Sequence, residues 1–262
     1  MMFEDDFRGT ELDRRKWQIV YHGNAYWNGM FDWDRRGVVV RDGVLRLRAF
    51  REGGRWKAGG LSMGLKATGF EGFLGGQVDI CARIPPGKGL GQAFLLWPAL
   101  PGPDGRLMWP PEIDIVETPG VDKQRVMTTL HWQGPRGNGD DRYDARFTDV
   151  DATQWHTYSI VWDPGRSLEF YVDGRHRHRW TQHVPDIPMS IGLQAHVASA
   201  SETWHNGPPA ADAPDPYEVE VRYVRWLGRR TLAPDRPGAA LCGPQEEGLT
   251  TSPRRGQRGG GR

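Results

Sequence analysis

Turn-forming dipeptides divide this chain into short segments. Asn-Gly occurs at positions 28, 138 and 206, and Asp-Gly occurs at positions 42, 104 and 173. Both dipeptides accept the positive φ angles of the two-residue turns that join antiparallel strands. The segments between them contain many β-branched and aromatic residues, and none shows a long 3.6-residue apolar period. Because 20 prolines in 262 residues would also interrupt helices, the sequence predicts an all-β fold, an antiparallel β-sandwich.

Several strands can be placed from the pattern of side chains. Residues 38–40 and 44–50 flank Asp42-Gly43, and the second run alternates apolar with polar side chains, as a half-buried strand does. Residues 157–162 and 168–172 flank turn residues 163–165, and Asp173-Gly174 leads into a third strand. The last strand-like run is 217–226. We therefore expect antiparallel hairpins in both halves of the chain.

The composition changes after the last strand-like run. Beyond Arg230 the chain is rich in Pro, Gly and Arg, and it closes on an Arg/Gly-rich segment, residues 254–262. Such a sequence has too few apolar residues to form a core and is typical of disorder. An Arg/Gly tail can also bind nucleic acid or an acidic polysaccharide, although a solvated tail is the commoner case. We expect a β-sandwich domain over residues 1–228 and a disordered tail over residues 229–262.

Charge and apolar runs exclude several classes of partner. Basic and acidic residues number 34 and 33, so no overall field attracts nucleic acid or an anionic membrane. The longest nearly unbroken apolar run, residues 93–100, is far shorter than the roughly 18 residues that a membrane helix needs. We expect a soluble monomer that binds neither nucleic acid nor membranes.

The two cysteines and the first residues say little about location. Cys81 and Cys242 are too few for a disulfide framework and lack the Cys-x-x-Cys spacing of zinc and redox sites, so we expect both to be inert. Residues 1–7 contain neither the basic nor the apolar region of a signal peptide. The location is therefore unknown, and export is neither shown nor excluded.

Three acidic residues alternate with β-branched residues in the segment Glu112-Ile113-Asp114-Ile115-Val116-Glu117. In a regular strand Glu112 and Asp114 share one face, and Glu117 points to the other. A β-bulge near Ile115-Val116 adds one residue and brings Glu117 to the face of the other two acids. The sequence therefore predicts three carboxyl groups on one face, with the isoleucines in the core.

Three neighbouring carboxyl groups suit the hydrolysis of a glycosidic bond. That reaction needs one ionised and one protonated carboxyl group, and neighbouring negative charges separate their pKa values. We assign Glu112 as the nucleophile and Glu117 as the general acid and then general base. Asp114 lies between them and can orient Glu112. An exposed acidic strand edge, or a cation site made by several carboxylates, stays open as an alternative.

This acidic segment resembles the Glu-x-Asp-x-x-Glu signature of family 16 glycoside hydrolases, in the bulged form of the laminarinases. The resemblance covers roughly residues 3–228 and includes residues 3–7, 43–47, 86–96, 162–174 and 221–225. It implies a concanavalin-like jelly roll of two curved sheets, whose concave face is the glycan cleft. It also implies that residues 1–228 are the catalytic domain of a retaining, endo-acting hydrolase, in which the three acids take the roles given above.

Six residues are predicted to bind the sugar chain. Aromatic rings stack on the apolar faces of sugars, and in the family a histidine at the place of His131 reaches the catalytic carboxylates. The resemblance also puts the loop that holds Tyr26 and Asn28 at the non-reducing side of the cleft. The predicted binding residues are Trp109, His131, Trp97, Tyr26, Asn28 and Trp204.

The chain departs from the family pattern in three places. Trp109-Pro110-Pro111 directly precedes Glu112, where the family often has a longer loop. The family's Ala-Phe-Trp is Ala93-Phe94-Leu95 here, with Trp97 two residues later on the same strand face. Arg222 stands where many members have an aspartate that binds a structural calcium ion. We therefore expect no metal ion at Arg222, and no cofactor.

Together these features predict a retaining endo-β-glycosidase that cleaves a polysaccharide or oligosaccharide, with β-1,3-glucan or β-1,3(4)-glucan as the preferred substrate. A galactan or a bacterial exopolysaccharide stays open. Two other functions also stay open: a non-catalytic, lectin-like glycan-binding protein, and a transglycosylase that uses the same acids. A polymeric substrate implies a secreted or periplasmic protein.

Overall fold

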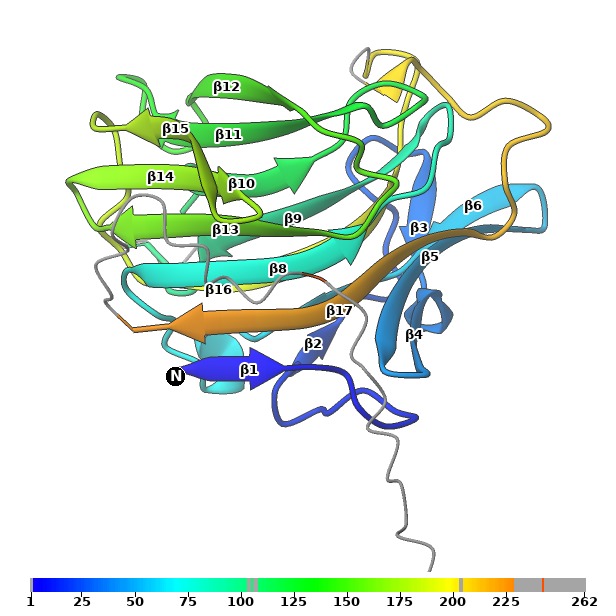
Figure 1. The fold of residues 1–262 in the computed structure, drawn as a ribbon, viewed down its shortest axis with the longest axis horizontal. Helices are drawn as coiled ribbons and strands as arrows, with labels where there is room; N and C mark the ends of the chain where they lie inside the picture. Colours follow the sequence, from blue (N-terminus) through cyan, green and yellow to red (C-terminus); the bar gives the residue numbers. More distant parts are fainter. Residues whose placement is uncertain (1, 103–104, 106–107, 203–204, 229–241, 243–262) are drawn as a thin grey trace, which may run out of the picture.

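Figure 1 shows the fold as a computed structural model, in which two β-sheets lie face to face. The structure describes residues 2–102, 105, 108–202, 205–228 and 242. In this part of the chain the helices are two 3-10 turns, η1 (Arg35–Gly37) and η2 (Lys66–Thr68). No helix among the described residues has the length and apolar character to cross a membrane. The predicted all-β sandwich is confirmed.

The larger sheet has ten strands. Along the sheet they are β15 (Arg175–Trp180), β14 (Ser167–Val172), β13 (His156–Asp163), β8 (Gly76–Arg83), β17 (Tyr217–Leu227), β5 (Val44–Glu52), β6 (Arg55–Ala58) and β3 (Phe31–Trp33). Two further strands lie off this path: β1 (Phe3–Asp5) pairs with β17, and β4 (Val38–Arg41) pairs with β5. The strand pairs are antiparallel, as the sequence predicts, except that β3 and β6 are parallel.

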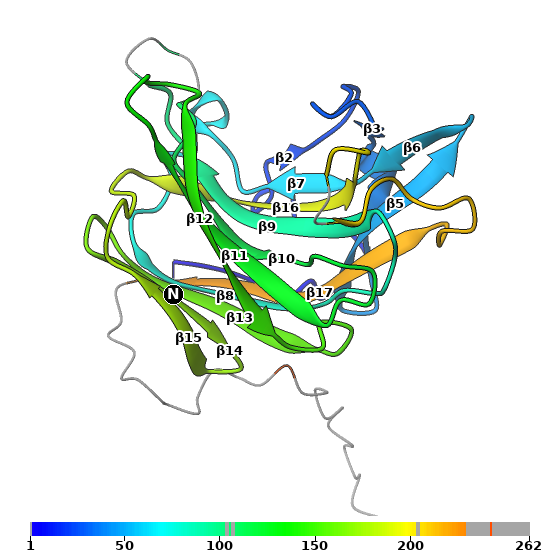
Figure 2. The same cartoon turned by 90° about the horizontal axis from the view of Figure 1, so that it is seen from above.

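The smaller sheet has seven strands, and it carries the acidic segment. Their order is β12 (Asp141–Asp149), β11 (Arg125–Gln133), β10 (Glu112–Glu117), β9 (Leu90–Pro98), β16 (Met189–Val197), β7 (Gly60–Ser62) and β2 (Ile19–Val20). Figure 2 shows that this sheet is curved, with β12 at one end and β7 and β2 towards the other. The predicted site strand, β10, therefore lies within the sheet rather than at an edge.

The predicted hairpins are present. Asp42 and Gly43 join the antiparallel strands β4 and β5, with φ angles of 55° and 68°. Asp173 and Gly174 join β14 and β15, with φ angles of 50° and 73°. Positive φ at both central residues suits the hairpin turns whose twist matches that of the strands. The local sequence thus determines where these strands reverse.

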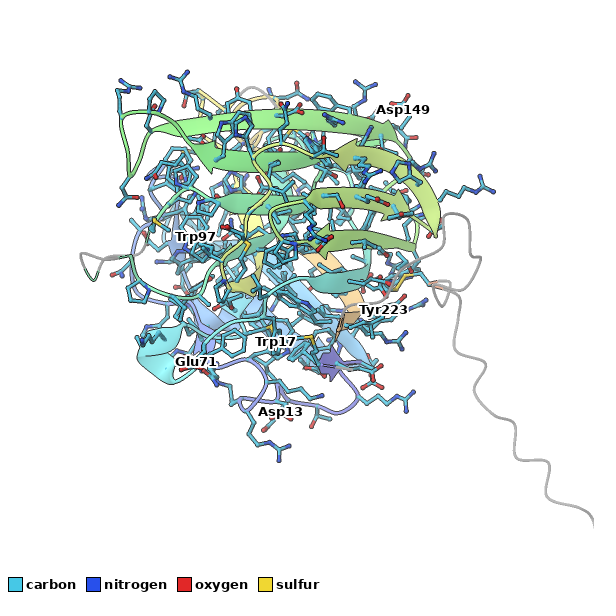
Figure 3. All side chains as sticks on the ribbon, turned by 90° about the vertical axis from the view of Figure 1, so that its left-hand side faces the viewer. Asp13, Trp17, Glu71, Trp97, Asp149 and Tyr223 are labelled. Carbon is cyan, nitrogen blue, oxygen red and sulfur yellow. A yellow bond between two sulfur atoms is a disulfide. The ribbon has the colours of Figure 1, made fainter. Side chains whose placement is uncertain are left out.

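Three tryptophans belong to the hydrophobic core. Trp17, Trp162 and Trp226 are at most 2% exposed, and Trp17 is labelled in Figure 3. Each indole N–H has an acceptor: Trp17 donates to Asp5 Oδ2 at 2.7 Å, Trp162 to the Pro185 carbonyl at 2.8 Å, and Trp226 to the Gly75 carbonyl at 2.9 Å. Such a partner offsets the cost of removing the indole N–H from water.

The two cysteines form a disulfide. Cys81 on β8 and Cys242 are bonded, with their Cα atoms 5.7 Å apart, a usual separation for a disulfide. The prediction that both are inert is wrong, because residues 161 positions apart in sequence meet in the fold. The rest of the predicted disordered tail, residues 229–241 and 243–262, lies outside the described residues, whereas Cys242 itself is buried.

Candidate active site

The acidic segment forms β10 with a break in its register. The pairing with β11 shifts between Asp114 and Glu117, and the pairing with β9 shifts between Asp114 and Val116. This is the predicted β-bulge, which turns all three acids to one face of the sheet. The opposite face is in the core, where Ile113, Ile115 and Val116 are fully buried. The acids therefore lie on the face of the smaller sheet that points away from the core, and Figure 2 shows how this sheet curves.

Trp109 contacts one of the three acids directly. Its indole Nε1–H donates to Glu112 Oε2 at 2.6 Å. The residue Glu112 is only 8% exposed, so this bond acts where little water competes with it. Because an indole only donates, it favours the ionised form of Glu112 over the protonated form.

His131 links Asp114 to a second carboxylate. Its Nε2 lies 2.9 Å from Asp114 Oδ2, and its Nδ1 lies 2.9 Å from Asp141 Oδ1. Carboxylates accept hydrogen bonds, so both ring nitrogens must donate, which makes the ring a cation. Burial lowers the pKa of His131, but the bonds to Asp114 and Asp141 and the charge of Glu112 outweigh it and raise that pKa to about 10.

The carboxyl groups of Glu112 and Glu117 both resist ionisation. Burial is the largest cause and the charge of Asp114 the next, and together they raise the pKa of both glutamates well above the usual range. The nearby His131 cation opposes this for both groups, whereas the Trp109 bond opposes it for Glu112 alone. The Trp109 bond thus favours the ionised form of Glu112 and has no counterpart among the causes at Glu117.

A continuous series of rings runs beside Glu112. Trp97 on β9, labelled in Figure 3, stacks on Trp109 with centroids 6.1 Å apart and planes 11° apart. Trp109 lies 6.3 Å from His131, and His131 lies 5.7 Å from Tyr143 on β12. Tyr143 is not among the predicted residues. It could be found only from the register that pairs it with His131.

The sequence of residues 30–215 matches the family of glycosyl hydrolases family 16. The chain belongs to this family. Over 189 residues, which are 67% of each chain, it is 31% identical to the glucan endo-1,3-beta-glucosidase of Cryptopygus antarcticus. It is 26% identical over 267 residues to glucan endo-1,3-beta-glucosidase A1 of Niallia circulans, a match that covers 86% of this chain and 37% of that protein.

Solved structures of family 16 proteins have the same fold. The endo-beta-1,3-glucanase of Pyrococcus furiosus superposes with a TM-score of 0.70 at 25% identity, over 86% of this chain and 92% of that chain. A family 16 protein of the Bacteroides ovatus mixed linkage glucan PUL superposes with a TM-score of 0.71, over 87% of this chain and 100% of that chain. At 22% identity the second comparison shows the fold alone.

The loop that holds Tyr26 and Asn28 lies next to strand β16, on the side of the acids where β9 and β16 lie. Gln194 on β16 donates to the Tyr26 hydroxyl at 3.5 Å, and Gln194 lies opposite Ala93, which pairs with Glu117. Burial raises the pKa of Tyr26, so its phenol stays protonated. The structure thus brings this loop towards the acids.

The amide of Asn28 is bonded within the protein. Its Nδ2 donates to Glu202 Oε2 at 2.7 Å and to the Val197 carbonyl at 3.1 Å, and its Oδ1 accepts from the Met30 N–H at 2.9 Å. Asn28 therefore holds its loop on the segment after β16. Its predicted contact with sugar stays a prediction, and Trp204 lies outside the described residues.

Glu202 is a buried carboxylate that the sequence analysis does not identify. It is 2% exposed, and His196 Nε2 lies 2.6 Å from its Oε1, while Ser199 N–H donates to Oε2 at 2.6 Å. Burial opposes its ionisation, but the His196 contact and the Ser199 bonds lower its pKa to about 2. The sequence around Glu202 does not predict this set of contacts, because one partner, Asn28, lies 174 residues away along the chain.

Glu112, Asp114 and His131 could also approach a metal ion. One ligand atom from each lies within 4.8 Å of the others. Both nitrogens of His131 are bonded to carboxylates, so an ion at the ring would have to displace Asp114 or Asp141. The second place is Arg222, which stands where many family members have an aspartate that binds calcium. Its guanidinium lies 4.0 Å from the Trp155 ring centroid and donates to the Cys242 carbonyl at 3.0 Å. That neither place holds a metal stays a prediction.

Proposed function

We propose that this family 16 glycoside hydrolase is a retaining endo-β-glycosidase of β-1,3-glucan or β-1,3(4)-glucan. The bulged strand β10 carries the proposal, because it turns three acids to the concave face and gives two of them different environments. The names of the relatives in Cryptopygus antarcticus and Niallia circulans support the β-1,3 linkage. The chain spans 37% of the Niallia circulans protein. The activity of that protein is therefore assigned to this chain only as a proposal.

In the first step Glu112 attacks the anomeric carbon of the bound sugar. The bond from that carbon to the glycosidic oxygen breaks, and Glu117 gives its proton to the departing oxygen. The product is a glycosyl ester on Glu112, with Glu117 ionised. The raised pKa of Glu117 keeps its carboxyl group protonated before the reaction, so that Glu117 can donate the proton in this step.

In the second step water replaces Glu112. Glu117 takes a proton from the water as its oxygen attacks the anomeric carbon, and the ester bond to Glu112 breaks. Two displacements at the same carbon retain its configuration. Asp114, next to Glu112 and bonded to the His131 cation, orients the nucleophile as the charge on it disappears and returns.

A panel assay tests this proposal. Purified protein is incubated with laminarin, mixed-linkage β-glucan, agarose, carrageenan and xyloglucan, and the new reducing ends are measured. We expect release from laminarin or mixed-linkage glucan, and loss of that release in Glu112→Gln. Glycan binding without release by the wild type would favour a lectin-like function, and release of longer chains from a single oligosaccharide would favour transglycosylation.

We also propose that the protein is a monomer that acts in the periplasm or outside the cell. A polymeric substrate supports this location, and so does the Cys81–Cys242 disulfide, because disulfides persist in oxidising compartments. Fractionation of the producing cells, with thiol labelling of the recovered protein, tests the location. We expect the protein outside the cytoplasm with neither cysteine labelled, and light scattering should give the mass of one chain. A labelled cytoplasmic pool would contradict the proposal.

A further inference from the structure

Strand β10 contains one residue more than its neighbours can pair with. The two residues of β10 between Asp114 and Glu117 share a single opposite residue on β11, Thr128. On the other side, the register with β9 leaves Ile115 without an opposite residue. The pairing from Glu112 to Asp114 is regular, so the extra residue changes the position of Glu117 and not that of Glu112.

The side chain opposite the bulge bonds to the backbone of the extra residue. A bulge disrupts the ladder between strands, and backbone groups that leave the ladder in the core need other partners. Thr128 is fully buried, and its Oγ1 donates to the Ile115 carbonyl at 3.1 Å. Thr128 on β11 therefore stabilises the bulged conformation of β10 from the core side.

A second buried side chain holds the backbone on both sides of Glu117. Gln92 on β9 is fully buried, and its Nε2 donates to the Val116 carbonyl at 3.4 Å. Its Oε1 accepts a shorter bond, of 2.7 Å, from the Thr118 hydroxyl. A single amide group therefore binds the residue before Glu117 and the residue after it.

The backbone after Glu117 has a further buried anchor. The side chain of Lys123 is fully buried. Its Nζ donates to the Thr118 carbonyl at 3.3 Å and to the Leu90 carbonyl on β9 at 2.6 Å. The end of β10 is therefore joined to β9 at two places, through Gln92 and through Lys123.

Gln92 and Thr128 occupy positions that suit apolar side chains. Both lie on the core face of their strands, and the residues two positions before and after each of them belong to the hydrophobic core: Leu90, Phe94, Val126 and Leu130. A polar side chain at such a position costs stability unless it is hydrogen-bonded. The hydrophobic core gives no reason for an amide and a hydroxyl here, whereas the bulge provides a bonding partner for each.

We propose that Gln92 and Thr128 are positioning residues, which hold the bulge and thereby determine where the carboxyl group of Glu117 lies relative to Glu112. Both act from the core face of the sheet, so neither touches the substrate. A misplacement of about 1 Å can lower a rate by about 100-fold. This inference deepens the proposed function and rests on it, because it requires Glu117 to protonate the departing oxygen.

The dependence of the rate on the leaving group tests this role in the full chain. Laminarin and mixed-linkage glucan need a proton on the departing oxygen, whereas 2,4-dinitrophenyl β-laminaribioside releases a stable anion that needs none. Thr128→Val keeps the shape of the side chain and removes its donor. We expect it to lower kcat/KM by about tenfold or more on the glucan and by about twofold at most on the aryl glycoside.

Two further variants show whether the pattern comes from Glu117. Gln92→Leu removes both bonds of the amide and should give the same pattern as Thr128→Val. Glu117→Ala removes the proton donor itself and should give the largest difference between the two substrates. Because kcat/KM reports the steps up to the glycosyl ester, the later need for a general base does not affect this comparison.

Matched controls separate positioning from stability. Thr128→Ser keeps the donor and should stay near the wild type on both substrates. Val126→Ala lies on the same core face of β11, so it should lower the unfolding midpoint and affect both substrates alike. Equal losses on both substrates in Thr128→Val and Gln92→Leu, or wild-type kinetics in both, would overturn the positioning role and leave the proposed function intact. A wild type that releases nothing from any glucan would overturn both.

Discussion

The indole nitrogen of Trp109 lies 2.6 Å from Glu112 Oε2, three residues further along the chain. Burial and the charge of Asp114 raise the pKa of Glu112, and this bond is the contact that acts on Glu112 and not on Glu117. A nucleophile must be ionised when the substrate binds. If Glu112 is the proposed nucleophile, the Trp109 bond extends its activity to lower pH, against the effects of burial and of Asp114.

Replacing Trp109 with Phe should move the acidic limb of the kcat/KM profile to higher pH. The ring can still stack on Trp97, but the N–H that favours ionised Glu112 is lost, so the pKa of Glu112 rises. A hydrogen bond to a charged group contributes about 1.5 kcal/mol, which corresponds to a shift of about one pH unit. Initial rates at low substrate between pH 4 and 9 measure the shift, and an unmoved acidic limb would contradict the assigned role.

The roles of Glu112 and Glu117 can be separated with azide. In Glu117→Ala the nucleophile remains, so azide should attack the glycosyl ester, restore turnover and give a glycosyl azide of retained configuration. In Glu112→Ala no ester forms, so azide should attack directly and give the inverted configuration. Proton NMR of the products distinguishes the anomers. The opposite pairing of variants and anomers would exchange the two assignments.

The charged His131 should make stability depend on pH. Its pKa is raised from 6.5 to about 10 in the folded protein. A raised pKa contributes stability that is fully present below about pH 6.5 and is lost as the pH rises through about 10. Urea unfolding at pH 6, 8 and 10 should show this decline in the wild type and a smaller one in His131→Gln. Equal slopes in both proteins would show that His131 is not the titrating group.

Glu202 should hold the loop of Tyr26 and Asn28 in place rather than act on the substrate. Glu202→Gln leaves His196 and Asn28 with a weaker partner, and loss of a buried charged partner costs about 3 kcal/mol. We expect a lower unfolding midpoint and a KM that rises more than kcat falls. Wild-type stability should also decline as the pH falls through about 2, the pKa of Glu202. Glu202→Asp is the matched control, and an unchanged KM in Glu202→Gln would remove the positioning role.

The disulfide should stabilise the fold without contributing to catalysis. Cys81 lies on β8 in the larger sheet, away from the concave face. Cys242→Ser should lower the free energy of unfolding by about 2–5 kcal/mol and leave kcat/KM at 25 °C unchanged. Dithiothreitol should destabilise the wild type to the same degree and have no effect on the variant. If dithiothreitol left the wild type unchanged, the bond would not form in solution.

The sequence alone determines the strand class, the hairpins and the three acids on one face. These depend on residues close together in the chain: Asp42-Gly43 reverses its own strands, and the spacing from Glu112 to Glu117 requires its own bulge. Local φ preferences and the two-residue alternation of a strand act over a few positions, so they can be interpreted without the rest of the fold.

Only the tertiary structure decides what surrounds those acids. Tyr143 faces His131 because β12 pairs with β11 in one register, and a slip of one residue would turn Tyr143 to the other face. Glu202 meets Asn28 across 174 residues, and Cys81 meets Cys242 across 161. Such contacts depend on how two sheets pack and which strands become neighbours. No local pattern encodes them, because the free energy that selects them comes from burying the whole core at once.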